Sequence, residues 1–100
     1  MILVRDIFEI QFGKMKEAKT AWEEGFKILK NGGWSPTRLL TDLTGKYYTL
    51  VLESTYKSLA DFEKAHSQAG HTKAMQDWYR KFTPLVMSGR REIFTIVEMP

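Results

Sequence analysis

Residues 2–29 of this 100-residue chain read ILVRDIFEIQFG and then KMKEAKTAWEEGFKIL, and the hydrophobic period changes at Gly13. Before that glycine, apolar residues alternate with a period of two, which predicts a strand from Ile2 to Phe12. After it, apolar residues follow the spacing of one helix face, which predicts a helix from about Lys14 that ends at Asn31. The chain therefore begins with a strand that leads into a helix.

Two further strands follow this helix. Alternating apolar residues predict one strand from about Thr37 to Leu43 and another from about Lys46 to Ser54. Thr44 and Gly45 separate them, and glycine permits a tight hairpin turn. These two strands are therefore expected to be antiparallel neighbours.

The last third of the chain repeats the order of helix and strand. Ser58 and Asp61 have the spacing of a capping box, which predicts the start of a second helix. Gly70 should end or kink this helix, and Pro84 should stop the helical part near the preceding residue. A final strand is expected from about Glu92 to Glu98.

The order strand, helix, strand, strand, helix, strand predicts a ferredoxin-like α+β fold, with a four-stranded antiparallel sheet of order 4-1-3-2. Both helices are expected on one face. The residues expected beneath the helices are Val4, Phe8, Ile10, Tyr48, Leu50, Phe94 and Ile96. The opposite face should carry Ile7, Val51, Ile93 and Val97 among Arg5, Glu9, Thr49 and Glu53.

That opposite face predicts a partner. Its aliphatic residues would form an exposed patch larger than soluble monomers usually carry. A second copy packed sheet to sheet about a two-fold axis would cover it, and Arg5 could then pair with Glu9 or Glu53. The expected interface of this homodimer consists of Arg5, Ile7, Glu9, Thr49, Val51, Glu53 and Val97.

Length and composition restrict the class of protein. A chain of 100 residues with 43% hydrophobic residues fits one domain, residues 1–100. With no cysteine it has no disulfide or thiol chemistry, which suits a reducing cytoplasm. The N-terminus lacks the features of a secretory signal and no apolar run is long enough to cross a bilayer, so no membrane association is expected. The net charge of +3 comes from cations scattered among acidic residues, which argues against a nucleic-acid partner.

The two histidines are candidates for acid–base chemistry. His66 lies beside Phe62 in the second helix, so its side chain can reach the sheet and act as a base. The alternative is a hydrogen-bonded histidine at the boundary of the core. A spacing of five separates His66 from His71 by about 140° on a continuous helix, and no third ligand accompanies them, so no metal site is expected. His71 is otherwise a residue at a helix start after Gly70.

The aromatic residues at helical spacing admit two interpretations. Trp22, Phe26, Phe62, Trp78 and Phe82 form a stripe that is typical of a packed core. Bulky rings above a twisted sheet can also leave a cleft in which a flat ligand stacks. Trp34 lies in a loop outside this stripe, where it could contact a second copy or cover a pocket.

Asp6 interrupts the apolar positions of the first strand. A carboxylate facing the helices could be a general base. It could equally be a strand residue paired with an arginine or lysine. The sequence alone leaves both open.

The junction at Phe12, Gly13 and Lys14, the helix with Trp22 and the closing run WYRKFTPLVMSGRREI, residues 78–93, together resemble the dimeric α+β barrel superfamily. The resemblance covers the whole chain and is to NIPSNAP-type and antibiotic-biosynthesis-monooxygenase-like domains. It implies a pocket between sheet and helices and an enzyme without a cofactor that oxygenates an aromatic or lipid-derived substrate. The residues that would line this pocket are Trp22, Phe26, Tyr48, Phe62, His66 and Trp78, with His66 and Asp6 as candidate catalytic groups.

Other functions are implied less directly. The chain also resembles NIPSNAP-type modules that are not enzymes, in which the dimer is structural and the core is filled. The haem-degrading branch of the superfamily carries an asparagine on its first strand and a histidine after a tryptophan on its second helix. Here the first strand has no asparagine and His71 precedes Trp78. RNA binding would need aromatic residues at positions of the third strand where residues 45–52 do not match.

Overall fold

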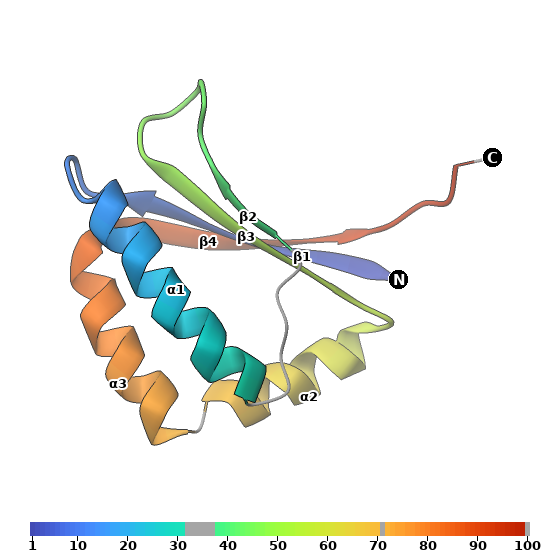
Figure 1. Ribbon diagram of the computed structural model, residues 1–100. Helices are drawn as coiled ribbons and strands as arrows, with labels where there is room; N and C mark the ends of the chain where they lie inside the picture. Colours follow the sequence, from blue (N-terminus) through green and yellow to red (C-terminus); the bar gives the residue numbers. More distant parts are fainter. Residues whose placement is uncertain (32–37, 71, 100) are drawn as a thin grey trace.

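The computed structural model describes residues 1–31, 38–70 and 72–99. Its elements, in chain order, are β1 (Ile2–Ile10), α1 (Met15–Asn31), β2 (Arg38–Thr41), β3 (Thr49–Tyr56), α2 (Leu59–Gly70), α3 (Lys73–Phe82), a 3-10 turn (Thr83–Leu85) and β4 (Val86–Thr95). The strands form one antiparallel sheet of order β2-β3-β1-β4. All three helices lie on one face of that sheet (Figure 1). This confirms the expected ferredoxin-like α+β fold and its strand order.

The turn between β1 and α1 forms where the hydrophobic period changes. Gly13 has a φ of +79°, a left-handed conformation that costs glycine little, and the Lys14 N–H donates to the Gln11 carbonyl oxygen at 3.0 Å. The helix that follows buries Ala18, Trp22 and Leu29, which lie on one stripe. This stripe attaches α1 to the sheet.

The second helical region is divided in two, as Gly70 predicted. At the start of α2 the Ser58 hydroxyl accepts from the Asp61 N–H at 3.2 Å, which is the first half of the expected capping box. The Asp61 carboxylate accepts from the Ser58 hydroxyl at 3.1 Å instead of from the Ser58 backbone N–H. A second cap, not expected from the sequence, starts α3, where the Thr72 hydroxyl accepts from the Met75 N–H at 3.2 Å. The 3-10 turn with Pro84 then ends the helical part, as predicted.

The last strand differs from the prediction. It begins at Val86 rather than Glu92, and its faces are exchanged. Ile93 is paired with Val4 and therefore lies on the helix-covered face, whereas Phe94 is paired with Leu3 on the opposite face. The prediction for this strand was wrong because apolar residues occupy both of its faces, so that hydrophobicity could not fix the register.

Beyond β4, the chain is no longer a strand, although the Ile96 N–H still donates to the Met1 carbonyl oxygen at 3.0 Å. Ile96 and Val97 follow the last strand residue, so neither has the sheet position expected for it. Val97 is 76% exposed. The other strands differ from their expected bounds at the ends only. In particular, β3 starts at Thr49 rather than Lys46, because Tyr48 has a φ of +43° that interrupts the extended backbone.

None of the helices in the described segments combines the length and the apolar composition that a bilayer crossing requires.

Candidate functional site

An open cavity of about 890 Å³ lies between the sheet and the helices, bordered by α2, α3 and β4. Most of its wall is apolar, and the side chains that form it include Phe8, Trp22, Phe62, Met75, Trp78 and Met87. A cavity is therefore present in the region where the sequence placed a pocket. Of the six residues predicted to line it, Trp22, Phe62, His66 and Trp78 do so.

The inner wall of the cavity is a cluster of packed rings. The Trp22 and Trp78 ring centroids are 4.5 Å apart, and Trp78 is stacked on Phe82 at 5.2 Å. The Trp78 Nε1–H donates to the Ala21 carbonyl oxygen of α1 at 2.6 Å. The Trp22 indole N–H is buried without a hydrogen-bond partner among the described residues, so packing alone holds this ring. These rings thus form the main core and only border the cavity.

Two residues predicted to contact a ligand lie elsewhere in this core. Phe26 is packed against Trp22 with centroids 5.5 Å apart, and Tyr48 meets Phe12 edge-on at 5.1 Å. Neither residue is part of the cavity wall. Both instead pack on the outer part of the core cluster.

A polar group occupies the base of the cavity. Asp6 of β1 and Arg91 of β4 are paired across the sheet, with Arg91 Nε 2.6 Å from Asp6 Oδ1. The Arg91 guanidinium lies over the Phe62 ring at 5.2 Å from its centroid, and the His66 ring is 5.5 Å from the same ring. Asp6 is thus paired with an arginine, which is one of the two interpretations that the sequence left open. His66 is exposed at the cavity wall.

Tyr56 of β3 lies close to this pair of charges, next to Phe62 of α2. Its ring is 5.3 Å from Phe62, and its buried hydroxyl is near Ser54 without the geometry of a hydrogen bond. Burial, with a smaller effect of the Asp6 charge, raises the pKa of Tyr56 to about 12. The phenol therefore stays protonated and neutral at physiological pH. No sequence pattern pointed to Tyr56 or Arg91, because strand register decides which residues lie near Asp6.

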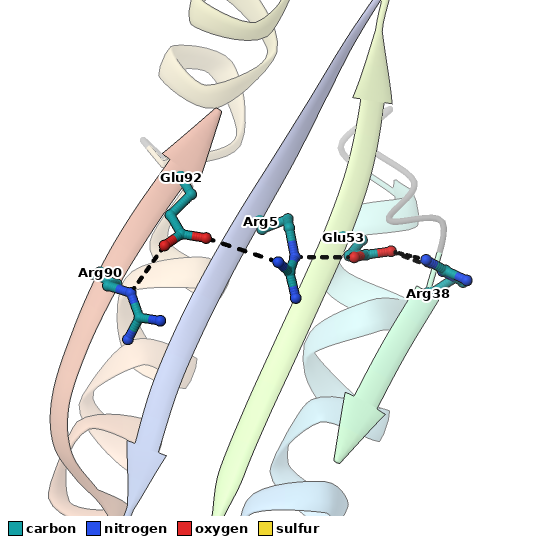
Figure 2. Close-up of polar contacts among 5 residues, drawn as sticks. All are labelled: Arg5, Arg38, Glu53, Arg90 and Glu92. Carbon is teal, nitrogen blue, oxygen red and sulfur yellow. Dashed lines mark hydrogen bonds and ion pairs between the residues drawn. The ribbon is translucent and has the colours of Figure 1, made fainter. Parts of the chain in front are cut away.

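The opposite sheet face, here called the open face, carries a row of alternating charges. Arg38, Glu53, Arg5 and Glu92 are neighbours in register across all four strands (Figure 2). Glu53 is central: its Oε1 accepts from Arg38 Nε at 2.7 Å, and its Oε2 is 3.1 Å from Arg5 Nε. The Arg5 N–H is not aligned with that contact, which is an ion pair rather than a hydrogen bond. We call these four residues the charged row.

The expected interface residues lie on this face, except Val97. Arg5 and Glu53 pair within one chain, and Glu9 is bound by the Lys46 ammonium, whose hydrogen bond lowers the pKa of the Glu9 carboxyl. Ile7 and Val51 are only 4% and 8% exposed in the single chain. The expectation that these two aliphatic side chains form an exposed patch is therefore wrong, because both are already buried within one chain.

Two predicted residues, Trp34 and His71, lie outside the described residues. Within the described segments, histidine, aspartate and glutamate side chains form no group of three that could hold a metal ion.

No protein-family model and no curated protein matches the sequence of the chain. Solved structures do match its fold. A NIPSNAP domain protein from Burkholderia xenovorans has a TM-score of 0.90 at 14% identity, over 97% of this chain and 95% of its own. A NIPSNAP family protein from Agrobacterium tumefaciens has a TM-score of 0.90 at 20% identity, over 97% and 93%.

An antibiotic-biosynthesis-monooxygenase-like protein from Nitrosomonas europaea is also similar, with a TM-score of 0.73 at 14% identity over 98% of this chain and 100% of its own. At these identities the similarity concerns the fold. The chain therefore has the α+β fold of NIPSNAP and antibiotic-biosynthesis-monooxygenase-like proteins, as its closing residues indicated.

Proposed function

We propose that this protein binds a small aromatic or apolar molecule in the cavity between α2, α3 and β4. The observation that carries the proposal is the cavity itself, whose volume of about 890 Å³ is within the range of small-molecule sites. Its mostly apolar wall with a minority of polar groups also fits such a site, because apolar contact supplies affinity and a few polar groups fix orientation.

For catalysis, we assign the candidate role of general base to His66. Its imidazole lies at the cavity wall, where it can take a proton from a bound phenol before the ring reacts with oxygen. Asp6 acts through Arg91, which it holds at the cavity base. This reaction is a monooxygenation, the class of reaction for which the Nitrosomonas europaea protein is named, and the proposed chemistry uses no cofactor. The test is to measure oxygen consumption after a phenol is added to the protein. Turnover would indicate an enzyme, and binding without oxygen consumption would indicate a module that only binds.

Ligand binding can be tested with N-phenyl-1-naphthylamine, a neutral apolar dye whose fluorescence rises when it is buried. We expect saturable binding of one dye per chain. Met75→Trp should weaken binding by about tenfold or more, because the larger side chain fills the space available for apolar contact. The measurement is a fluorescence titration at constant protein concentration.

Ala74→Trp is the matched control, because Ala74 precedes Met75 in α3 but is exposed and outside the cavity wall. Its affinity for the dye should equal that of the unmodified protein. No saturable binding, or equal loss in both variants, would contradict the proposed function.

We also propose that the protein forms a homodimer through the open face. The support is charge complementarity. A two-fold axis parallel to the strands reverses the charged row, so Arg38 of each copy lies over Glu92 of the other and Glu53 lies over Arg5. An axis across the strands would oppose like charges instead. Two-fold packing with the first geometry is therefore favoured by the row itself.

Phe94 and Ile93 provide a matched pair of variants for this dimer. The two residues are adjacent in β4 and similarly exposed, 47% and 42%, but Phe94 is on the open face and Ile93 is on the helix-covered face. Phe94→Asp should weaken the dimer by about a hundredfold, since each interface loses two apolar rings and gains two charges. Sedimentation equilibrium measures this. A monomeric unmodified protein, or equal weakening by Ile93→Asp, would contradict the proposal.

A further inference from the structure

The cavity wall has more cationic than anionic side chains. Asp6 is the one carboxylate in the described part of its wall, which also includes three arginines, Arg80, Arg90 and Arg91, and His66 as a further hydrogen-bond donor. Arg90 is in register with Ile7 and its side chain pairs with Glu92 on the open face, so Arg80 and Arg91 remain as the cations on the cavity side. Asp6 is already neutralised by Arg91, and Arg80 makes no ion pair with a described residue. The cavity therefore has an excess of positive charge next to an apolar wall.

Arg91 is held by two contacts that leave the terminal nitrogens of its guanidinium free to bind a ligand. Nε binds Asp6 at 2.6 Å, and the face of Phe62 supports the guanidinium carbon at 5.2 Å. The two terminal nitrogens make no hydrogen bond to any described residue, and 39% of the side chain is exposed. A guanidinium presents its terminal N–H groups as a fork that matches the two oxygens of a carboxylate or sulfonate.

The apolar wall begins directly beside this fork. Phe62 contacts the guanidinium, and Met75 and Trp78 continue the wall along α3. A ligand with its acidic group at Arg91 would therefore place its apolar body against these side chains. A neutral apolar ligand would cover the two terminal nitrogens of Arg91 without giving them a hydrogen-bond partner, which costs free energy.

We propose that the ligand of this cavity is an organic anion whose acidic group binds the terminal nitrogens of Arg91 and whose apolar body lies against Phe62 and Met75. This inference rests on the proposed function, because it assigns a ligand class to the same cavity. Asp6 orients the guanidinium through Nε and leaves the other side of the fork to the ligand.

Two dyes that differ by one acidic group test this proposal. 8-Anilinonaphthalene-1-sulfonate is N-phenyl-1-naphthylamine with an added sulfonate, so the ratio of the two affinities reports the contribution of the anion. Arg91→Gln should weaken binding of the sulfonate by about tenfold to a hundredfold, the effect of a lost charged hydrogen bond, and leave binding of the neutral dye unchanged. Both affinities are measured by fluorescence titration.

Arg90→Gln is the matched control. Arg90 is adjacent to Arg91 and also borders the cavity, but its side chain pairs with Glu92 on the open face, Nε to Oε2 at 3.2 Å (Figure 2). Its removal changes the net charge by the same amount and should leave both affinities within about twofold, since a screened distant charge contributes little. Equal weakening by the two variants would show that net charge, and not the Arg91 fork, attracts the anion, and would overturn the proposal.

Asp6 supplies a test in the opposite direction. Asp6→Asn removes a negative charge beside Arg91 and keeps an oxygen that can accept from Nε, so the sulfonate should bind several-fold more tightly, roughly the effect of one nearby charge. The double variant Asp6→Asn, Arg91→Gln removes both charges, so no unpaired charge remains to unfold the chain, and it should bind the neutral dye normally and the sulfonate weakly. Normal sulfonate binding by the double variant would overturn the anion assignment. Failure of both dyes to bind the unmodified protein would instead overturn the proposed function.

Discussion

Glu53→Gln is expected to lower the free energy of unfolding by about 3 kcal/mol, the lower end of the cost of breaking a buried ion pair. The Glu53 side chain is only 6% exposed, and each carboxylate oxygen faces a different arginine, Arg38 and Arg5. Glutamine has the same shape, but its amide group would point hydrogen-bond donors at a guanidinium, which is itself a donor. Urea unfolding followed by circular dichroism at constant protein concentration measures the loss.

Glu92→Gln is the control for this effect. Glu92 is in the same charged row, but its side chain is 34% exposed and its contact with Arg5 is 3.8 Å long. Its loss should cost less than about 1 kcal/mol, as for exposed ion pairs. Equal losses in the two variants would show that water screens the whole row, and that burial of Glu53 does not strengthen its pairs.

Gly25→Ala should lower the free energy of unfolding by about 2 kcal/mol, although alanine is the better helix former. A Cβ at this position of α1 would lie 2.8 Å from two ring carbons of Trp78 and 3.0 Å from its Nε1. Trp78 cannot move aside easily, because it is 2% exposed, stacked on Phe82 and hydrogen-bonded to the Ala21 carbonyl. Thermal and urea unfolding provide the measurement.

A double-mutant cycle identifies the cause of this loss. In a Trp78→Phe background the added methyl group meets a smaller ring, so Gly25→Ala should cost nearly nothing or stabilise by up to about 1 kcal/mol through helix propensity. If the cost is the same in both backgrounds, contact with Trp78 is not the reason for the glycine.

The strand order could be predicted because the chain marks its turns clearly. Gly13 lies at the change of hydrophobic period, and Gly70 and Pro84 mark the breaks in the helical region. The start of β4 could not be predicted in this way. Ser88, Gly89 and the arginines after them are not typical of a strand, and they form one only because β1 supplies the pairing partner.

Only the part of the candidate site that depends on local spacing could be predicted from the sequence. The position of His66 relative to Phe62 follows from helical spacing, and the structure places the rings 5.5 Å apart. The pairing of Asp6 with Arg91 joins residues 85 positions apart, and only the register of β1 with β4 brings them together. A one-residue shift would have placed Arg90 there instead, which is why the cationic fork could not be inferred from the sequence.

The burial of Ile7 and Val51 in the single chain has a consequence for the order of assembly. Because both residues are already buried within one chain, a newly made chain can complete its folding before it meets another copy. The folding rate should then be independent of protein concentration, and formation of the proposed homodimer should follow as a separate, salt-sensitive step between folded protomers. A dimer formed in this way would exchange subunits without unfolding, which obligate dimers with an apolar interface do only slowly.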